Sequence, residues 1–319
     1  MKKVSIVISC YDEEGNIHEL HKQLSAMLSD IKTDAEMIFV NDGSKDRTLL
    51  YCMEIQKKDP RVKIVNFTRN FGHEAAMIAG MNYATGDAVA FMDADLQNPP
   101  AVMGQLIKAW QSGEKIVLTR RRNQVRPGIL YKMFQKLFYL ILAILSPVKI
   151  PKDMPDFRIL DREYVDFLKR FDERDVMFRG MLSLITDVNK AKVIEYDSPD
   201  RFAGKTKYGF SIRSVMLVLD SVMQFSTRPL YLAMWAAVAM GVLSFGLGLY
   251  VIIERFIRFH PTPGYAAIMC AITFVGAIVM FVQAGIGLYI GKIHMEVKKR
   301  PMYFAEYIIA PESKKKPAR

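Results

Sequence analysis

The sequence predicts an α/β fold, a mostly parallel sheet with flanking helices, followed by two transmembrane helices near the carboxyl end. Short, continuous apolar runs alternate with segments of helix length, as expected for strands that are buried on both faces of a parallel sheet. Later in the chain, two longer apolar runs exceed the roughly 20 residues needed to cross a bilayer. A hydrophobic content of 51% and a mean hydropathy of +0.09 are high for a wholly soluble protein of 319 residues.

The predicted strands are residues 4–10, 37–40, 62–67, 87–92 and 116–119. The first leads into an acidic turn, after which Asn16 is placed to cap a helix. The second ends in the N-D-G-S turn at residues 41–44. Because ligands bind beyond the carboxyl ends of the strands in an open α/β sheet, we expect Asp12, Asp42 and Asp93 to converge there.

Two carboxylates, Asp93 and Asp95, directly follow the fourth predicted strand. Alternate side chains share a face of a strand, so both carboxylates can point into one crevice. Their oxygens suit a hard cation such as Mg²⁺ or Mn²⁺, which in turn bridges phosphate oxygens. The same D-x-D pattern, taken alone, is also compatible with a solvated acidic turn.

Three motifs carry a resemblance to a known family: S-C-Y-D-E-E at residues 9–14, V-N-D-G-S at 40–44 and D-A-D-L-Q at 93–97. In this order and spacing they resemble the family two glycosyltransferases, which have the nucleotide-binding GT-A fold. The polyprenyl-phosphate branch, which includes dolichyl-phosphate mannose synthase and bacterial undecaprenyl-phosphate glucosyltransferases, is similar over nearly the whole chain. The resemblance implies a metal-dependent, inverting transfer of a sugar from a nucleotide-sugar to a polyprenyl phosphate.

The resemblance also implies roles on the donor side. The expected nucleotide-sugar site consists of Tyr11, Glu13, Asp42, Arg69, Asp93 and Ala94. Its first three members would hold the base, and Asp93 would hold the ribose. Asp95 and Gln97 would seat Mg²⁺ or Mn²⁺ on the diphosphate, where the cation neutralises charge on the departing group.

On the acceptor side, the expected contacts to the lipid phosphate are Arg120, Arg126, Arg201 and Lys207. The family has an arginine after the fifth strand and a lysine in a G-x-[ST]-K-Y turn, and these map to Arg120 and Lys207. Lys205 departs from the residue type expected there, so either Lys205 or Lys207 is the functional lysine. The basic clusters could also be ordinary solvated surface.

Asp156 begins a D-F-R-I-L segment that resembles the family's acceptor-facing aspartate segment. A turn or cap ahead of the helix from Asp161 is the alternative. A phosphate acceptor is already largely ionised at neutral pH, since its second pKa is about 6. We therefore expect Asp156 to orient the acceptor more than to deprotonate it. The catalytic candidates are Asp95, Arg120, Asp156 and Lys207.

The histidines give weaker signals. His18 and His21 have ligand-like spacing, but no third ligand is evident nearby, which favours a solvent-exposed helix face. His73 begins a helix beside the predicted crevice, where it either touches the donor or packs the helix end. Three scattered cysteines indicate a reducing compartment.

Three parts are predicted: a cytoplasmic catalytic domain, a two-helix anchor and a basic cytoplasmic tail, at residues 1–228, 229–291 and 292–319. Amphipathic interfacial helices are expected at about 129–147 and 209–226, although both could instead pack on the sheet. The two spans are residues 230–253 and 265–290, with buried core helices as the alternative. Basic residues after the second span place both termini on the cytoplasmic side of a bacterial inner membrane.

The net charge of +11 admits nucleic acid as a partner, but no base-reading motif accompanies it. Attachment to an anionic membrane explains the charge more simply. We expect a nucleotide-sugar, a polyprenyl phosphate and the membrane as partners, no nucleic acid, and a homo-oligomer with a tetramer as one candidate.

Three other functions compete with this interpretation. A processive polysaccharide synthase would carry a Q-x-x-R-W motif, which neither tryptophan fits. A catalytically silent membrane scaffold would have no need of Asp93, Asp95 and Gln97. A transporter subunit is disfavoured because neither span holds an ionisable residue. The sugar stays open: UDP-glucose comes first, followed by aminoarabinose derivatives, galactose, N-acetylated sugars and GDP-mannose.

Overall fold

The computed structural model describes residues 2–122, 154–171, 178, 181–182, 190–199, 228–258 and 264–310. The chain divides into two compact units, one with residues 1–133, 148–211 and 300–319, the other with residues 134–147 and 212–299. The predicted interfacial helices and four of the basic candidates lie outside the described residues: Arg126, Arg201, Lys205 and Lys207.

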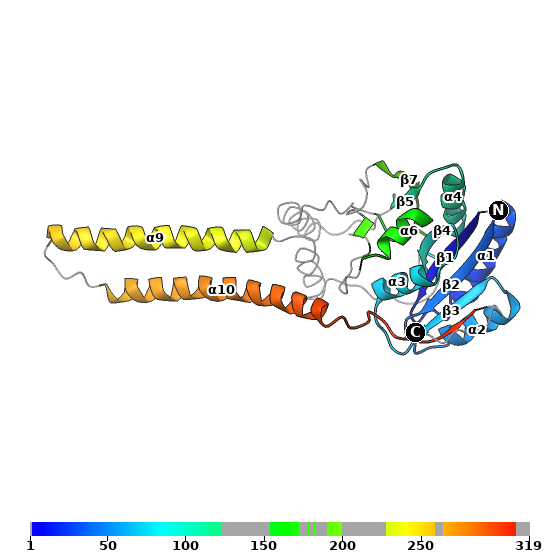
Figure 1. The fold of residues 1–319 in the computed structure, drawn as a ribbon, viewed down its shortest axis with the longest axis horizontal. Helices are drawn as coiled ribbons and strands as arrows, with labels where there is room; N and C mark the ends of the chain where they lie inside the picture. The colour runs from blue at the N-terminus through cyan, green and yellow to red at the C-terminus, as the bar shows by residue number, and fades with distance from the viewer. Residues whose placement is uncertain are drawn as a thin grey trace. The chain divides into compact units, whose positions relative to one another are not determined.

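Within the described residues, the first unit contains an eight-stranded mixed sheet in the order β7-β5-β6-β4-β1-β2-β3-β8 (Figure 1). The strands are β1 (Lys3–Cys10), β2 (Asp34–Asn41), β3 (Val62–Phe67), β4 (Ala88–Asp93), β5 (Ile116–Arg121), β6 (Arg158–Asp161), β7 (Lys192–Tyr196) and β8 (Ala305–Ile309). The helices are α1 (Ile17–Ile31), α2 (Thr48–Lys58), α3 (His73–Tyr83), α4 (Pro100–Gln111) and α6 (Arg162–Leu168). Strands β4, β1, β2 and β3 are parallel, so their carboxyl ends share one edge. The α/β prediction and all of the predicted strands are confirmed.

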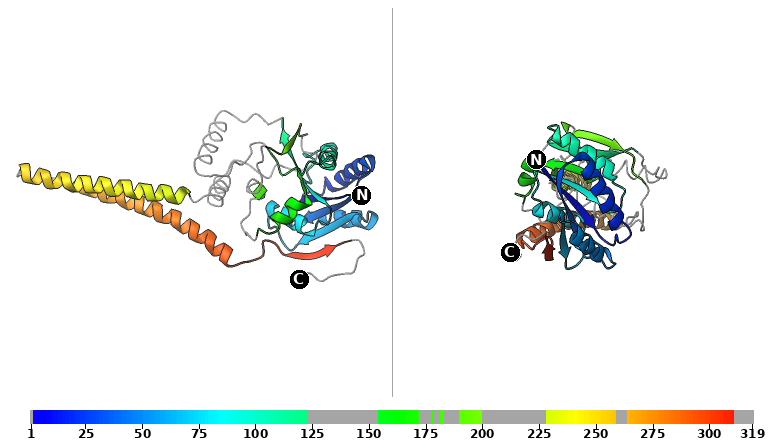
Figure 2. Two further views of the ribbon diagram at one scale, coloured as in Figure 1. Left: turned by 45° about the horizontal axis from the view of Figure 1, so that its top comes forward. Right: turned by 90° about the vertical axis from the view of Figure 1, so that its right-hand side faces the viewer.

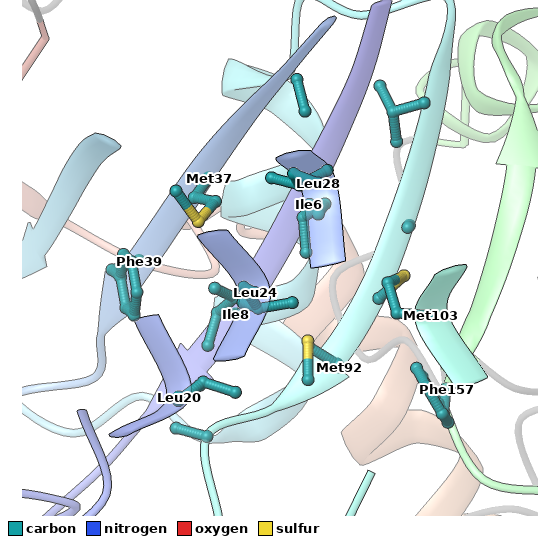
Figure 3. Packing of buried hydrophobic residues seen from close by; sticks show 14 of the residues in the cluster. Ile6, Ile8, Leu20, Leu24, Leu28, Met37, Phe39, Met92, Met103 and Phe157 are labelled. Atoms are coloured by element: carbon teal, nitrogen blue, oxygen red, sulfur yellow. The ribbon is translucent and has the colours of Figure 1, made fainter. Parts of the chain in front are cut away.

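Helices cover both faces of the sheet. Along β1, Ile6 and Ile8 pack in the cluster that contains α1, whereas Val7 between them packs in the cluster that contains α3. Figure 3 shows Leu20 and Leu24 of α1 close to the first pair. Since successive strand side chains point to opposite faces, burial on both sides requires an unbroken apolar run. The strands are therefore buried on both faces, as the apolar runs in the sequence predict.

Strands β6, β7 and β8 are not predicted from the sequence. Strand β6 lies antiparallel between β4 and β5, and this separates the fourth and fifth predicted strands. Strand β8 follows the last long apolar helix in the chain and pairs antiparallel with β3. Beside it, the ring of Tyr303 stacks on Phe67 with centroids 5.0 Å apart, and Asn66 Nδ2 donates to Glu306 Oε2 at 2.9 Å. Residues 303–309, which follow α10, are therefore part of the sheet domain.

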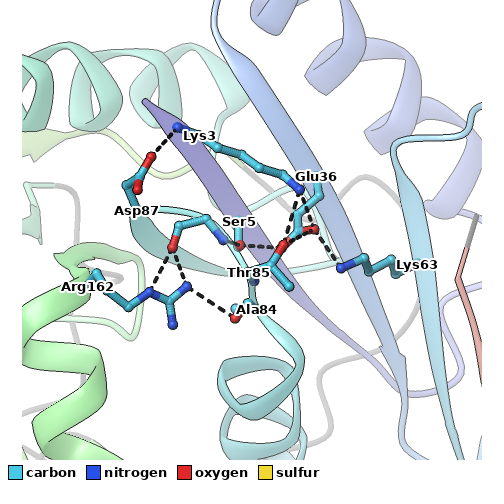
Figure 4. Close-up of polar contacts among 9 residues, drawn as sticks. Lys3, Ser5, Glu36, Lys63, Ala84, Thr85, Asp87 and Arg162 are labelled. Carbon is cyan, nitrogen blue, oxygen red and sulfur yellow. Dashed lines mark hydrogen bonds and ion pairs between the residues drawn. The ribbon is translucent and has the colours of Figure 1, made fainter. Parts of the chain in front are cut away.

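A buried carboxylate joins three strands near their amino-terminal ends, at the edge opposite their carboxyl ends (Figure 4). Glu36 pairs with Lys63 Nζ at 2.7 Å and with Lys3 Nζ at 2.9 Å. It also accepts hydrogen bonds from Ser5 Oγ at 2.5 Å and from Thr85 N at 2.7 Å. Burial raises the pKa of Glu36, but these partners outweigh burial and lower it to about 2.

The second unit contains two long helices, α9 (Arg228–Arg258) and α10 (Tyr265–Val297), which lie side by side in opposite directions (Figures 1 and 2). They coincide with the two predicted spans. In the described residues, only Phe274–Val297 is long and apolar enough to cross a membrane, and α9 holds a shorter apolar stretch, Ala233–Leu243. Large apolar side chains of both helices are exposed, as expected for a surface that contacts lipid or protein. One candidate membrane helix is thus identified, and the second span stays a prediction.

Candidate active site

Four polar side chains meet at the carboxyl edge of the central strands. Ser9 near the end of β1 is the register partner of Asp93 at the end of β4. Asp156 comes just before β6, and because β6 runs antiparallel to β4, its start lies beside the end of β4. His73 is the first residue of α3, which follows the loop after β3. Residues 9, 73, 93 and 156 are therefore brought together by three strands and a helix start.

His73 lies between two carboxylates. Its Nδ1 is 3.5 Å from Asp93 Oδ1, and its Nε2 is 3.5 Å from Asp156 Oδ2. Ser9 Oγ lies 3.1 Å from the same Nδ1 and donates to Asp93 Oδ1 at 3.2 Å. Behind Asp156, Arg158 forms a buried ion pair with its Oδ1. Asp156 is only 3% exposed, so its charge is balanced inside the protein.

The charges of this cluster shift the ionisation of its members. Burial lowers the pKa of His73, but the hydrogen bond with Asp156 and the charges of Asp93 and Asp156 outweigh it and raise the pKa to about 9. The two carboxylates therefore favour the protonated, imidazolium form of the ring. Burial raises the pKa of Asp93, and the neighbouring Asp95 and Asp156 add to this, while His73 opposes them.

The D-x-D turn is held in an unusual backbone conformation. Leu96 has φ +62°, a left-handed value that is uncommon outside glycine. Gln97 N donates to Asp95 Oδ1 at 3.1 Å, and the Asp95 side chain is largely buried. Ala94 N donates to Ser9 O at 3.2 Å, which ties the turn to β1. Such strain is found where the surroundings enforce it, often at functional sites.

Asp42 also lies at this edge, but its carboxylate contacts protein backbone. It accepts hydrogen bonds from Phe71 N at 2.6 Å and from Gly72 N at 3.0 Å. Burial raises the pKa of Asp42, although these two amides and His73 oppose the effect. The Arg69 guanidinium is exposed and stacks on the Phe71 ring, 4.2 Å from its centroid. Asp42 therefore fixes the loop that carries Arg69 and leads into His73.

The acidic turn after β1 is also held by hydrogen bonds to the segment after β2. Asp12 Oδ1 accepts from Lys45 N at 2.8 Å, and Glu13 N donates to Thr48 Oγ1 at 2.8 Å. Asn16 does occupy the position before α1, but its side chain makes no capping hydrogen bond. Its Nδ2 donates instead to Glu13 Oε2 at 2.5 Å, so the predicted cap is wrong and the amide orients a candidate base-binding carboxylate. Tyr11 is half-buried in the same turn.

The arginines that end β5 point to different partners. Arg120 Nη1 lies 3.6 Å from Glu195 Oε1 on β7 and is about half exposed. Arg121 Nε donates to Tyr196 Oη at 3.1 Å, and Tyr196 Oη donates to Asn98 Oδ1 at 3.0 Å. Asn98 Nδ2 in turn donates to Asp93 Oδ2 at 3.4 Å. The hydrogen-bonded path from β5 to the carboxylates thus begins at Arg121.

Sequence reasoning missed several of these residues. Ser9 lies inside one quoted motif and Asn98 directly follows another, so their polar character at these positions was an available signal. Tyr196 and Arg158 carry no local signal, because their roles depend on β7 and β6. His18 lies 3.7 Å from Glu54 Oε2 and is half exposed, whereas His21 pairs with Asp59 at 2.9 Å. Among the described residues, no group of three or more metal-ligating His, Cys, Asp or Glu side chains is found.

The family follows from comparison with known proteins. The family model for glycosyl transferase family 2 matches residues 5–168. The chain belongs to this family. The sheet domain is therefore a GT-A glycosyltransferase domain, as the three motifs indicate.

Similar proteins of known sequence match this glycosyltransferase along almost its whole length. The uncharacterized glycosyltransferase YkcC of Bacillus subtilis is 36% identical over 98% of this chain and 95% of its own. The SfII prophage-derived bactoprenol glucosyl transferase of Shigella flexneri is 34% identical over 94% of this chain and 96% of its own. The prophage bactoprenol glucosyl transferase homolog of Escherichia coli is 34% identical over 96% of this chain and 99% of its own.

Solved structures are more distant. Glucosyl-3-phosphoglycerate synthase from Mycobacterium tuberculosis, in complex with Mn²⁺, UDP-glucose and phosphoglyceric acid, is 18% identical with a TM-score of 0.45 over 70% of this chain and 77% of its own. A likeness this distant carries no inference about ligands here.

Proposed function

We propose that this glycosyltransferase transfers a sugar, glucose from UDP-glucose first, to a polyprenyl phosphate at the cytoplasmic face of a bacterial inner membrane. The observation that carries the proposal is the meeting of Asp93, Asp95 and Asp156 at one edge of a GT-A sheet. Two relatives that align along nearly the full chain are named for glucosyl transfer to bactoprenol, and this supports the acceptor class.

The donor side is proposed at the ends of β1, β2 and β4. Tyr11, Glu13 and Asp42 would contact the base and Asp93 the ribose, with Arg69 and Ala94 beside them. For the metal, Asp95 offers a carboxylate and Gln97 an amide oxygen across a strained turn, and these hard donors fit Mg²⁺ or Mn²⁺. Such a cation, when bound, neutralises charge on the departing diphosphate.

In the proposed reaction, a phosphate oxygen of the lipid attacks the anomeric carbon from the face opposite the nucleotide. The new carbon–oxygen bond forms as the bond to the diphosphate breaks, so the configuration inverts once. Asp156, held by Arg158 and His73, would orient the acceptor. Arg120 is proposed to contact the acceptor phosphate, together with Arg126, Arg201 and Lys207 (or Lys205).

The membrane assignment rests on the exposed apolar helices. Phe274–Val297 would cross the bilayer, and α9 would form a second span despite its shorter apolar stretch. The sheet domain, which β8 joins from beyond α10, would then lie on the cytoplasmic side. A homo-oligomer is proposed on the resemblance alone.

Mass spectrometry of the lipid product tests the proposal. Purified protein would be incubated in liposomes with undecaprenyl phosphate and, separately, UDP-glucose, UDP-galactose and GDP-mannose. We expect a polyprenyl-phosphate hexose with UDP-glucose. Product with another donor alone would change the sugar but keep the chemistry. Intact donor and unmodified lipid in every reaction would favour the silent scaffold.

A further inference from the structure

The geometry points to a positioning role for His73: it is the charged bridge that holds the donor-side carboxylate of Asp93 and the acceptor-side carboxylate of Asp156 at a fixed spacing. This inference rests on the proposed function, because that function assigns the two carboxylates to opposite substrates. It gives His73 a role in place of the donor contact or helix-end packing that the sequence left open.

The two ring nitrogens face different elements. Nδ1 faces Asp93 on β4, and Nε2 faces Asp156 ahead of β6, each at 3.5 Å. A ring that only packed a helix end would not need to direct its two nitrogens at carboxylates from two separate segments of the chain. Ser9 Oγ, 3.1 Å from Nδ1, holds the ring from the β1 side.

The helix start itself is fixed in place. Gly72, the residue before α3, has φ +101°, a conformation that glycine adopts without strain. The amides of Phe71 and Gly72 donate to Asp42, which anchors the backbone that leads into His73. The ring position is therefore determined by β2, β4 and the segment before β6 together.

The negative charges around the ring favour a cation at the position of His73. The ionisable groups around the ring are Asp42, Glu74, Asp93 and Asp156, with Arg158 behind Asp156. Neighbouring carboxylates repel one another, and a positive charge placed between Asp93 and Asp156 reduces that repulsion. Arg158 pairs with Asp156 Oδ1, and His73 lies between Asp156 Oδ2 and Asp93.

Three substitutions separate charge from shape. His73→Ala removes the bridge, His73→Gln keeps a neutral hydrogen-bonding group, and His73→Lys keeps a cation. The matched control is His18→Gln, because His18 is half exposed on α1. For each variant, kcat/KM for undecaprenyl phosphate is measured at saturating UDP-glucose, the Kd of UDP is measured by calorimetry, and the melting midpoint reports folding.

We expect His73→Ala to lower kcat/KM for the lipid by about tenfold to a hundredfold, as for loss of a charged hydrogen bond. The Kd of UDP should change less than kcat/KM for the lipid, since Asp93 keeps its contacts with Ser9 and Asn98. His73→Lys should recover more activity than His73→Gln. Variants that transfer at the wild-type rate, or a glutamine that outperforms lysine, would overturn the charged bridge.

A second measurement is independent of transfer. Histidine-labelled protein is titrated by NMR, with the His73 signal assigned by its absence from His73→Gln. We expect His73 to remain protonated above pH 8 and Asp156→Asn to lower its titration midpoint by at least about one unit. A His73 titration midpoint at the ordinary histidine value, unchanged by Asp156→Asn, would reject the charged bridge. Wild-type protein that gives the expected titration but no lipid product would instead reject the proposed function and leave the bridge intact.

Discussion

Replacing Glu36 by glutamine tests the electrostatic account of the fold most directly. The carboxylate is 3% exposed, and its partners hold its pKa at about 2 against an ordinary 4.5. A shift of about 2.5 units corresponds to about 3 kcal/mol of stability at pH 7. Because the folded pKa is the lower one, this stability is complete above pH 4.5 and is lost as the pH falls towards 2. At pH 3 about 1.4 kcal/mol should remain.

The assay is thermal unfolding of the purified protein at pH 7 and at pH 3. At pH 7, Glu36→Gln should lower the midpoint by roughly 6–12 °C, and at pH 3 by much less. The control is Glu163→Gln, which breaks the exposed pair with Lys115 and should leave the midpoint close to that of wild type at both pH values. A midpoint within 1 °C of wild type at pH 7, or an equal loss at both pH values, would refute the reasoning.

Three further predictions concern the site and the sheet edge. Gly43 has φ +64°, and the Cβ of Gly43→Ala would lie 2.3 Å from the Arg69 carbonyl carbon. This variant should therefore weaken UDP binding at least about tenfold, as measured by calorimetry. The control Gly113→Ala, where φ is +113° and no atom lies within 4 Å of the added Cβ, should bind UDP like wild type. Arg121→Ala removes the first residue of the hydrogen-bonded path to Asp93, so it should weaken UDP binding by about twofold to tenfold. Arg120→Ala should instead reduce transfer and leave UDP affinity unchanged. Equal effects of the two variants on UDP affinity would contradict this distinction. Tyr303→Ala should lower the melting midpoint by a few degrees through loss of its stacking on Phe67, worth about 0.5–1.5 kcal/mol, and the exposed neighbour variant Phe304→Ala should melt like wild type.

Local pattern was sufficient for the central sheet. The central residues of strands β1 to β5 are mostly apolar because helices cover both faces of the sheet, and the D-x-D turn comes at the end of β4. Strand β6 has only four residues, R-I-L-D, and β7 and β8 mix charged with apolar residues, so neither length nor period marks them. Their place in the sheet depends on pairing between residues far apart in sequence, which no local window contains.

The same reason limits prediction of the site. Asp93 and Asp95 could be placed at a strand end from spacing alone. That Asp156 approaches them depends on the antiparallel insertion of β6, and the contacts of His73 depend on both. The predicted cap at Asn16 does not form, and the orientation of its side chain is set by the hydrogen bond from Nδ2 to Glu13, three residues earlier. The capping propensity of a residue predicts the position it occupies, whereas the hydrogen-bond partner of its side chain depends on the surrounding fold.

The most direct test of the central claim compares Asp95→Asn with Asp30→Asn in transfer of glucose from UDP-glucose to undecaprenyl phosphate across a Mn²⁺ titration. Asp95 lies largely buried beside Asp93, whereas Asp30 is exposed on α1. An amide is a poorer ligand than a carboxylate for a hard cation, so Asp95→Asn should lose at least about 99% of the rate and require more Mn²⁺. Asp30→Asn should match wild type. Full transfer by Asp95→Asn, or wild-type transfer in excess chelator, would contradict the claim that the carboxylates at the end of β4 form a metal-dependent active site.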